Sequence, residues 1–323
     1  ARRLRRAVTP LALAVAFTCF LGGWFAWKAK TTDVQRLGPA APADSLESRL
    51  PARDVQRRIA TELAPRIMLH EQERFGPADP ADFVAASRLV WFHERGSSQV
   101  VPRGQVDARS LGRNCDNAPS GCYQWFGNLA REITRPYERT GRVPGLTRER
   151  GFALDPDGPI RYGDLGPRPQ VPVFFQFRRS AGGRLLLAYW FHYSFSRALV
   201  PGRGEATDGT LSHEGDWENI EILFGSDDAT PAQILFYGHG APHRVDWADV
   251  CKVDVPDCPS SERGHPIVYS ALDSHASYGT AGRHPVPRFK MLVPDKTSAA
   301  GARWDSWEVP GGLRFATDQP WYG

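Results

Sequence analysis

The sequence predicts a mainly β protein, with one jelly-roll-like β-sandwich domain that has long loops and follows a single N-terminal transmembrane helix. Stretches rich in Val, Ile, Tyr, Phe and Trp recur along the chain, and clusters of Gly, Pro and Asp separate them. The 27 prolines and 31 glycines indicate elaborate loops on a sheet scaffold. An apolar run near the N-terminus predicts the helix.

The apolar run from Ala7 to Trp27 contains no charged side chain. A helix rises ~1.5 Å per residue, so a run of this length crosses a ~30 Å hydrocarbon core. Arginines precede the run, and the positive-inside rule therefore keeps the N-terminus in the cytoplasm and the main domain in the periplasm or another extracytoplasmic space. A cleaved signal peptide is the alternative, but no small-x-small cleavage site precedes Lys28.

The chain divides into three parts on composition. Residues 1–30 hold the Arg-rich start and the anchor, 31–52 form a Pro/Ala-rich tether, and 53–323 form the sandwich domain. An amphipathic helix is expected from Asp54 to about Ala64, where Pro65 marks its boundary. No composition break suggests a second globular domain.

Strands are expected where β-branched and aromatic residues concentrate between turn signals. The expected strands are Arg88–His93, Val171–Arg178, Arg184–Phe195, Trp217–Phe224, Gln233–Tyr237, Pro266–Leu272 and Phe289–Val293. The stretches 103–170 and 241–265 look irregular and are expected to be loops.

The charge balance argues against nucleic acid as a partner. The whole chain carries +4, and residues 1–30 hold six basic groups and no acidic ones, so the remainder carries −2. A nearly neutral exported domain lacks the basic surface that phosphate backbones require. The expected partners are instead the lipid bilayer and integral membrane subunits that contact the helix and tether.

Four cysteines outside the apolar run form two pairs with the same spacing, Cys115/Cys122 and Cys251/Cys258. Each pair lies in a loop rich in polar and turn-forming residues, so two local disulfides are expected in an oxidising compartment. A zinc site built from all four cysteines is the alternative, although zinc pairs usually stand two to four residues apart.

The chemistry of the chain concentrates in His213-Glu214-Gly215-Asp216-Trp217-Glu218. Side chains repeat every two residues along a strand, so Asp216 and Glu218 would share a face, and His213 could fold back from the preceding turn. An imidazole and two carboxylates suit a divalent cation, calcium or magnesium. The alternative is a hydrogen-bonded polar cluster at the start of a strand.

Further side chains could complete such a site. Asp208 and Glu205 lie in the loop before His213, and Asp208 is the expected fourth metal ligand. His192, His239 and His275 are candidate neighbours from three other segments. Each of these histidines taken alone could equally serve a structural role.

No nucleophile elbow, phosphate loop or dinucleotide fingerprint occurs in the sequence. Metal-assisted hydrolysis would need a base beside the metal, for which His275 and Glu214 are the candidates. The residues therefore favour a role without catalysis.

Several motifs together resemble the vacuolar protein sorting-associated protein 62 family, over about residues 60–285. The segments that carry the resemblance are Leu63–Glu73 with Pro77, Trp190–Tyr193, His213–Glu218, His265–Tyr269 and Ser274–Tyr278.

The His213–Glu218 motif is also similar to the G-H-R-H-D-W-E heptapeptide of necrosis- and ethylene-inducing-like proteins. That resemblance implies a β-sandwich with a divalent cation in a cleft, held by His213, Asp216 and Glu218, with Asp208 as the counterpart of a further upstream aspartate. Gly215 replaces the second histidine of the heptapeptide.

Three classes of function follow. A secreted toxin would gain little from permanent anchoring, so the favoured hypothesis is an accessory, stabilising subunit of a membrane complex, photosynthetic or respiratory. A cation-dependent lipid- or glycan-binding module, as the cytolysin resemblance implies, is the second. A metal-dependent hydrolase is the third.

Overall fold

The structure is a computed structural model, and all of its described residues belong to the unit from Leu50 to Gly323. The structure describes residues 50–93, 96–107, 151–180, 182–197, 199–200, 204–205, 213–238, 242–253, 255, 258, 260, 262–286 and 294–319.

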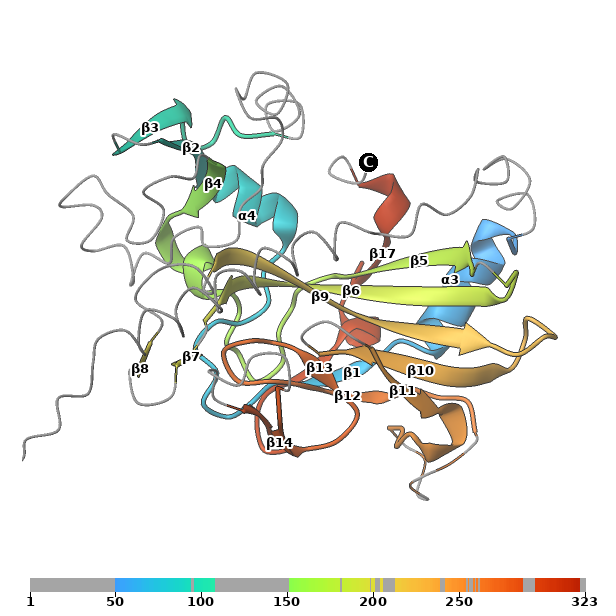
Figure 1. Cartoon of the computed structure of the whole chain (residues 1–323). Helices are drawn as coiled ribbons and strands as arrows, with labels where there is room; N and C mark the ends of the chain where they lie inside the picture. The colour runs from blue at the N-terminus through green and yellow to red at the C-terminus, as the bar shows by residue number, and fades with distance from the viewer. Residues whose placement is uncertain are drawn as a thin grey trace, which may run out of the picture. The chain divides into compact units, whose positions relative to one another are not determined.

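The largest element is a six-stranded sheet with the order β11-β10-β9-β6-β5-β17 (Figure 1). All its neighbouring strands are antiparallel except β17 and β5, which pair in parallel. The strands are β5 (Val173–Arg179), β6 (Leu185–Ser196), β9 (His213–Phe224), β10 (Pro231–Tyr237), β11 (Pro242–Asp246) and β17 (Leu313–Phe315).

A second sheet of four short strands has the order β13-β12-β1-β16. Its strands are β1 (Arg66–Met68), β12 (Ile267–Ser270), β13 (Ser277–Tyr278) and β16 (Arg303–Asp305). Side chains from both sheets join one hydrophobic cluster, to which β1 contributes Ile67, β12 Val268 and β16 Trp304. The mainly β fold is therefore confirmed and is consistent with a β-sandwich. The jelly-roll-like strand order stays a prediction.

Alternation along β6 and β9 determines which side chains enter the core shared by the two sheets, although both faces of β6 are buried. Odd residues of β6, such as Tyr189 and Phe191, and even residues of β9, such as Ile220 and Ile222, enter the shared core. The other face of these strands carries Leu186 and Leu223, among others.

Short elements surround the sheets. They are α3 (Arg53–Glu62), α4 (Pro80–Ala86), β2 (Ser87–His93), β3 (Gly96–Val101), β4 (Gly151–Pro156), β7 (Leu199–Val200), β8 (Gly204–Glu205), β14 (Gly282–His284) and β15 (Asp295–Thr297), with 3₁₀ turns at η1 (Gly158–Tyr162), η2 (Trp247–Asp249), η3 (Ser306–Glu308) and η4 (Ala316–Asp318).

The helix expected from Asp54 is confirmed as α3, and four expected strands are found within two residues of their predicted bounds. The fifth, β9, begins at His213 and not at Trp217, so the prediction that His213 lies in a turn before the strand was wrong. The sixth, expected over Pro266–Leu272, is shorter than predicted, and the seventh, Phe289–Val293, lies outside the described residues. The stretch 241–265 was wrongly expected to be a loop, since it contains β11, whose exposed side chains give no alternating pattern. The stretch 103–170 contains β4 and η1.

Within the described residues, no helix has the length and apolar character to cross a membrane. The expected anchor and tether lie outside those residues up to residue 49, so the transmembrane helix stays a prediction.

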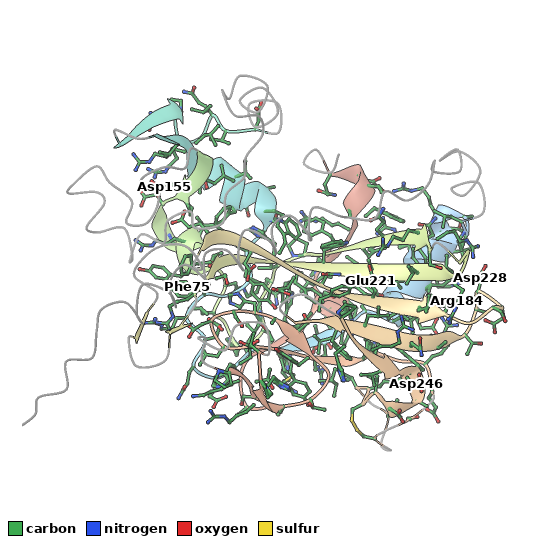
Figure 2. All side chains as sticks on the ribbon, in the orientation of Figure 1. Phe75, Asp155, Arg184, Glu221, Asp228 and Asp246 are labelled. Atoms are coloured by element: carbon green, nitrogen blue, oxygen red, sulfur yellow. A yellow bond between two sulfur atoms is a disulfide. The ribbon has the colours of Figure 1, made fainter. Side chains whose placement is uncertain are left out.

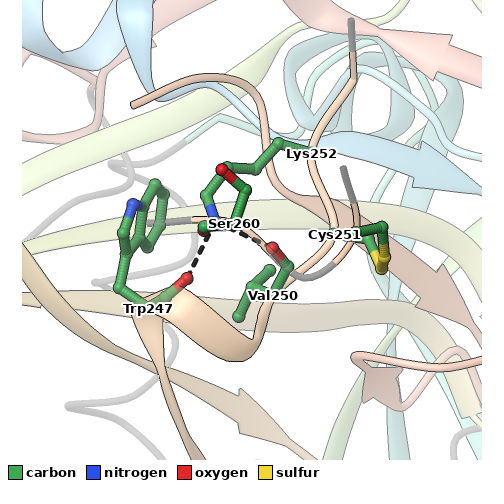
Figure 3. The surroundings of a disulfide bond; sticks show 6 residues. Trp247, Val250, Cys251, Lys252 and Ser260 are labelled. Carbon is green, nitrogen blue, oxygen red and sulfur yellow. Dashed lines mark hydrogen bonds between the residues drawn. A yellow bond between two sulfur atoms is a disulfide. The ribbon is translucent and has the colours of Figure 1, made fainter. Parts of the chain in front are cut away.

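The expected disulfide between Cys251 and Cys258 is present, and the Cα atoms of the two cysteines lie 4.8 Å apart. The other expected pair, Cys115 and Cys122, lies outside the described residues. Lys252 is buried beside the disulfide, and its ammonium donates to the carbonyl oxygens of Trp247, Val250 and Ser260 (Figure 3). Burial lowers the pKa of Lys252 to about 8. These bonds therefore hold together the segment that carries the disulfide.

Candidate functional site

The site begins at the first residues of β9. Gly215 has φ +68, a left-handed conformation, and a Cβ there would lie 3.3 Å from the Phe83 ring. Glycine at this position therefore allows the backbone of β9 to approach the Phe83 side chain of α4 closely. From that point Asp216 and Glu218 lie on the face that enters the core, opposite Tyr193 and Phe191 of β6. The shared face expected for the two carboxylates agrees with this register.

His275 occupies the centre of the site and is 0% exposed. Its Nδ1 lies 3.0 Å from Asp216 Oδ2, and its Nε2 lies 2.9 Å from the Phe75 carbonyl oxygen and 3.6 Å from Glu73 Oε1. A carbonyl and a carboxylate oxygen only accept hydrogen bonds, so both ring nitrogens donate and the ring is an imidazolium. Tyr193 stacks on this ring with centroids 4.0 Å apart.

The electrostatics agree with that assignment. Burial alone would lower the pKa of His275, but Glu73 and Asp216 outweigh it and raise the pKa to about 10. Burial would conversely raise the pKa of Glu73, and the charge of His275 holds it below its ordinary value. His275 is thus a built-in cation between two carboxylates.

The turn that carries His275 is held in a strained conformation. Asp273 and His275 both have positive φ, at 67° and 55°. Asp273 accepts two hydrogen bonds from the Arg197 guanidinium, at 2.8 and 2.6 Å, and its backbone N–H donates to Glu73 Oε2 at 2.9 Å. These bonds fix the turn, and therefore the imidazolium, against β6.

Glu218 differs from its neighbours because none of the described residues donates a hydrogen bond to it or forms an ion pair with it. Burial and the Asp216 carboxylate raise the pKa of Glu218 well above its ordinary value, and Asp295 acts in the same direction. His275 opposes this shift without cancelling it. The site therefore holds a carboxylate whose charge is poorly compensated.

Asp295 completes what we call the carboxylate cluster, which consists of Glu73, Asp216, Glu218 and Asp295. It accepts hydrogen bonds from Ser274 Oγ at 2.9 Å and from Tyr278 Oη at 2.7 Å. Burial, followed by the Asp295 charge, raises the pKa of Tyr278, so this phenol stays a hydrogen-bond donor.

The other predicted site residues are not all brought together. His192 points to the opposite face of β6, where its Nδ1 donates to the Ala78 carbonyl at 2.9 Å and its ring packs on Phe83 and Trp217. Burial lowers the pKa of His192 to about 4, so it is neutral. His239, Asp208 and the side chain of His213 lie outside the described residues.

Among the side chains that the structure describes, no three histidine, cysteine or acidic groups are gathered closely enough to hold a metal ion. The predicted four-ligand set thus stays a prediction, with Asp216 and Glu218 as its described members.

Sequence reasoning missed Glu73, Asp295 and Arg197 as site residues. Glu73 accepts a hydrogen bond from the backbone N–H of Asp273, which lies 200 residues further along the chain. Asp295 is positioned by the pairing of β14 with β15. The one available signal was Glu73 itself, which belongs to the Leu63–Glu73 stretch that carries the family resemblance.

Phe75, whose carbonyl oxygen accepts a hydrogen bond from His275, lies near one end of the long strands, and Asp228 in the β9–β10 turn lies near their other end (Figure 2). The site therefore lies at the end of the sandwich where β9 begins and β6 finishes.

No protein-family model matches the chain. Two curated proteins of Saccharomyces cerevisiae are similar to it: "Putative vacuolar protein sorting-associated protein TDA6", 22% identical over 254 residues, and "Vacuolar protein sorting-associated protein 62", 24% identical over 255 residues. Each alignment covers 75% of this chain and 50% of the relative, so the chain spans about half the length of the curated relatives it matches.

A crystal structure of Necrosis and Ethylene inducing Protein 2, from the causal agent of cocoa's Witches Broom disease, aligns with 80% of this chain and 72% of its own. The identity is 12% and the TM-score 0.31, which is too low to support an argument. The sequence likeness to the two yeast proteins therefore suggests, at the level of the family only, a relation to the vacuolar protein sorting-associated proteins.

Proposed function

We propose that this chain is an extracytoplasmic binding module that holds one divalent cation, calcium or magnesium, at Asp216 and Glu218. The cation would present open coordination positions to an oxygen-bearing lipid headgroup or glycan. The observation that carries the proposal is Glu218, a carboxylate in a poorly solvated site without a hydrogen-bond donor or counter-ion among the described residues.

Such a carboxylate is costly unless something compensates its charge. The protein's own imidazolium, His275, is already bonded to Asp216 and the Phe75 carbonyl. A hard cation with oxygen ligands is the compensation that fits the donor set. His213 and Asp208 would supply further ligands, as the heptapeptide resemblance implies.

The site favours binding over hydrolysis. A general base needs a free lone pair, and both nitrogens of His275 donate hydrogen bonds. His275 is therefore unsuited to the role of base at neutral pH. Glu214, the other candidate base, lies opposite Phe195, toward the start of β9.

The membrane anchor and the accessory-subunit hypothesis rest on residues outside the described part of the chain. With a transmembrane helix over Ala7–Trp27, the module would be tethered to a bilayer with its N-terminus in the cytoplasm. Stoichiometric co-purification with integral membrane subunits, photosynthetic or respiratory, would establish the accessory role.

Isothermal titration calorimetry on the full chain in detergent, after removal of metals with EDTA, tests the cation proposal. We expect calcium or magnesium to bind the wild type at one site, and Asp216→Asn and Glu218→Gln each to weaken binding at least about tenfold. Asp249→Asn, an exposed carboxylate outside the cluster, is the matched control and should bind as the wild type does. Absence of binding by the wild type, or equal binding by all variants, would contradict the proposal.

A further inference from the structure

The segment 158–168, called here the Tyr162 segment, exposes apolar side chains beside the site. In the described part of the chain three large hydrophobic residues are exposed, and two of them belong to this segment: Tyr162 at 39% and Leu165 at 47%. The third, Trp217, is exposed at 37% on the outer face of β9. Tyr162 and Leu165 thus place two exposed apolar side chains within four consecutive residues, called here the protrusion.

The protrusion is held rigidly by main-chain contacts. The Gly76 N–H donates to the Tyr162 carbonyl at 2.7 Å, and the Asp164 N–H donates to the Pro77 carbonyl at 2.7 Å. A Cβ on Gly163 would lie 2.1 Å from the Gly76 carbonyl oxygen, so only glycine permits this approach. The main-chain contacts of this segment therefore hold Tyr162 and Leu165 in their exposed positions.

The same support links the protrusion to the candidate site. The Tyr162 ring stacks against Phe75 at 6.2 Å between centroids, and the Phe75 carbonyl accepts a hydrogen bond from His275. Whatever contacts Tyr162 and Leu165 thus reaches the end of the sandwich where the carboxylate cluster lies.

Cationic side chains flank the apolar ones. The Arg161 guanidinium lies over the Tyr162 ring, 4.8 Å from its centroid, and Arg168 is exposed three residues after Leu165. Neither arginine forms an ion pair with any residue that the structure describes. The acidic residue between them, Asp164, has both oxygens occupied by the Gly166 and Gln170 N–H groups at 2.8 Å.

We infer that the Tyr162 segment is a membrane-contact site, which inserts Tyr162 and Leu165 into the headgroup layer while Arg161 and Arg168 bind anionic lipid. Aromatic and aliphatic side chains next to arginines are typical of interfacial contacts. Two side chains are far too small for a stable protein interface, which buries about 800 Å² on each partner. A shallow membrane contact needs no such area. The inference goes beyond the cation proposal and stands without it.

Site-directed spin labelling tests this inference on the full chain. The variants Leu165→Cys and Ser226→Cys, in a Cys19→Ser background, are labelled without reductant and reconstituted in EDTA. The vesicles are either pure phosphatidylcholine or a mixture that contains phosphatidylglycerol. Ser226 is exposed in the β9–β10 turn at the far end of the sheet and reports a position in water. The readout is collision of the label with an aqueous nickel complex and with oxygen.

In phosphatidylglycerol vesicles we expect the Leu165 label to collide with nickel at least about threefold less often than the Ser226 label, and to gain oxygen collisions. Adding Arg161→Glu and Arg168→Glu should abolish that protection, because these changes repel anionic lipid. Equal nickel access at both positions in anionic vesicles would overturn the inference, and would leave a protein partner or water as the neighbour. Equal protection in pure phosphatidylcholine would overturn the anionic assignment. Because the samples contain EDTA, failure here is distinct from failure of cation binding.

Discussion

Glu218 and Glu221 lie three residues apart on β9, are both removed from solvent to a large extent, and have opposite surroundings. Glu221 faces the outer side of the sheet, where it pairs with Arg178 and accepts a hydrogen bond from Tyr237 Oη at 2.9 Å. Glu218 faces the core side and has neither kind of partner among the described residues. One glutamate is compensated by the chain itself, and the other needs compensation from elsewhere.

A structural carboxylate and a candidate ligand can thus be distinguished on one strand by the partners that each carboxylate has. Arg178 belongs to β5 and reaches Glu221 across β6, so that ion pair ties three strands together. On the other face the imidazolium of His275 is shared between Asp216 and Glu73, and no cation pairs with Glu218 among the described residues. We therefore expect substitutions on the two faces to differ in size and in sign.

The largest effect is expected from His275→Ala. Removing the imidazolium leaves Asp216 and Glu73 buried without their cation, which should lower the free energy of unfolding by about 3 to 5 kcal/mol. Urea denaturation at pH 7 in EDTA measures it. His243→Ala, at an exposed position of β11, is the control and should change stability by less than about 0.5 kcal/mol. A small effect of His275→Ala would show that the ring is not the charge that holds the cluster.

The same chemical change on the two glutamates should act in opposite directions. Glu221→Gln weakens the contact with Arg178, half of whose side chain is solvent-exposed, and should cost about 1 to 2 kcal/mol. Glu218→Gln removes an uncompensated charge and should stabilise the metal-free protein by about 1 kcal/mol. Urea denaturation of both variants in EDTA gives the comparison. If both substitutions changed the free energy of unfolding in the same direction, the two glutamates would not differ in how their charges are compensated.

The pH dependence of stability follows from the raised pKa of His275. A group that binds its proton more tightly in the folded state stabilises it fully below its unfolded pKa, here 6.5, and loses that contribution as pH rises toward about 10. The wild type should therefore lose stability over this window relative to His275→Gln. Lys252, whose pKa burial lowers to about 8, acts in the opposite sense above that pH, but both proteins share it. If the free energy of unfolding changed with pH in the same way for both proteins, His275 would not be an imidazolium in the folded state.

The smallest effects are expected from removing single hydroxyl groups. Tyr237→Phe takes away the donor to Glu221 and should cost about 1 kcal/mol. Tyr193→Phe should change stability by less than about 0.5 kcal/mol, because its buried hydroxyl has no hydrogen-bond partner among the described residues. Thermal unfolding of both variants under one buffer condition compares them. A larger loss for Tyr193→Phe would show that the hydroxyl does bond a partner, for which the neighbouring Ser270 hydroxyl is the candidate.

Local periodicity accounts for what could be predicted from the sequence. The two-residue repeat of side chains along β9 places Asp216 and Glu218 on the same face, as the sequence predicts. The pairing of β17 with β5 and of β1 with β12 was beyond prediction, because short parallel pairs join distant segments without a local signal. His275 could be singled out as a residue, but its bond to Asp216 depends on how a strained turn packs against β6.

The most direct test of the uncompensated carboxylate compares thermal unfolding of the wild type and Glu218→Gln in EDTA and in excess calcium. We expect calcium to raise the midpoint temperature of the wild type, since a ligand that binds only the folded state stabilises it. Glu218→Gln should unfold at a higher temperature than the wild type in EDTA and gain little from calcium. The proposal would be contradicted if neither calcium nor magnesium changed the wild-type midpoint. It would also be contradicted if Glu218→Gln unfolded at a lower temperature than the wild type in EDTA.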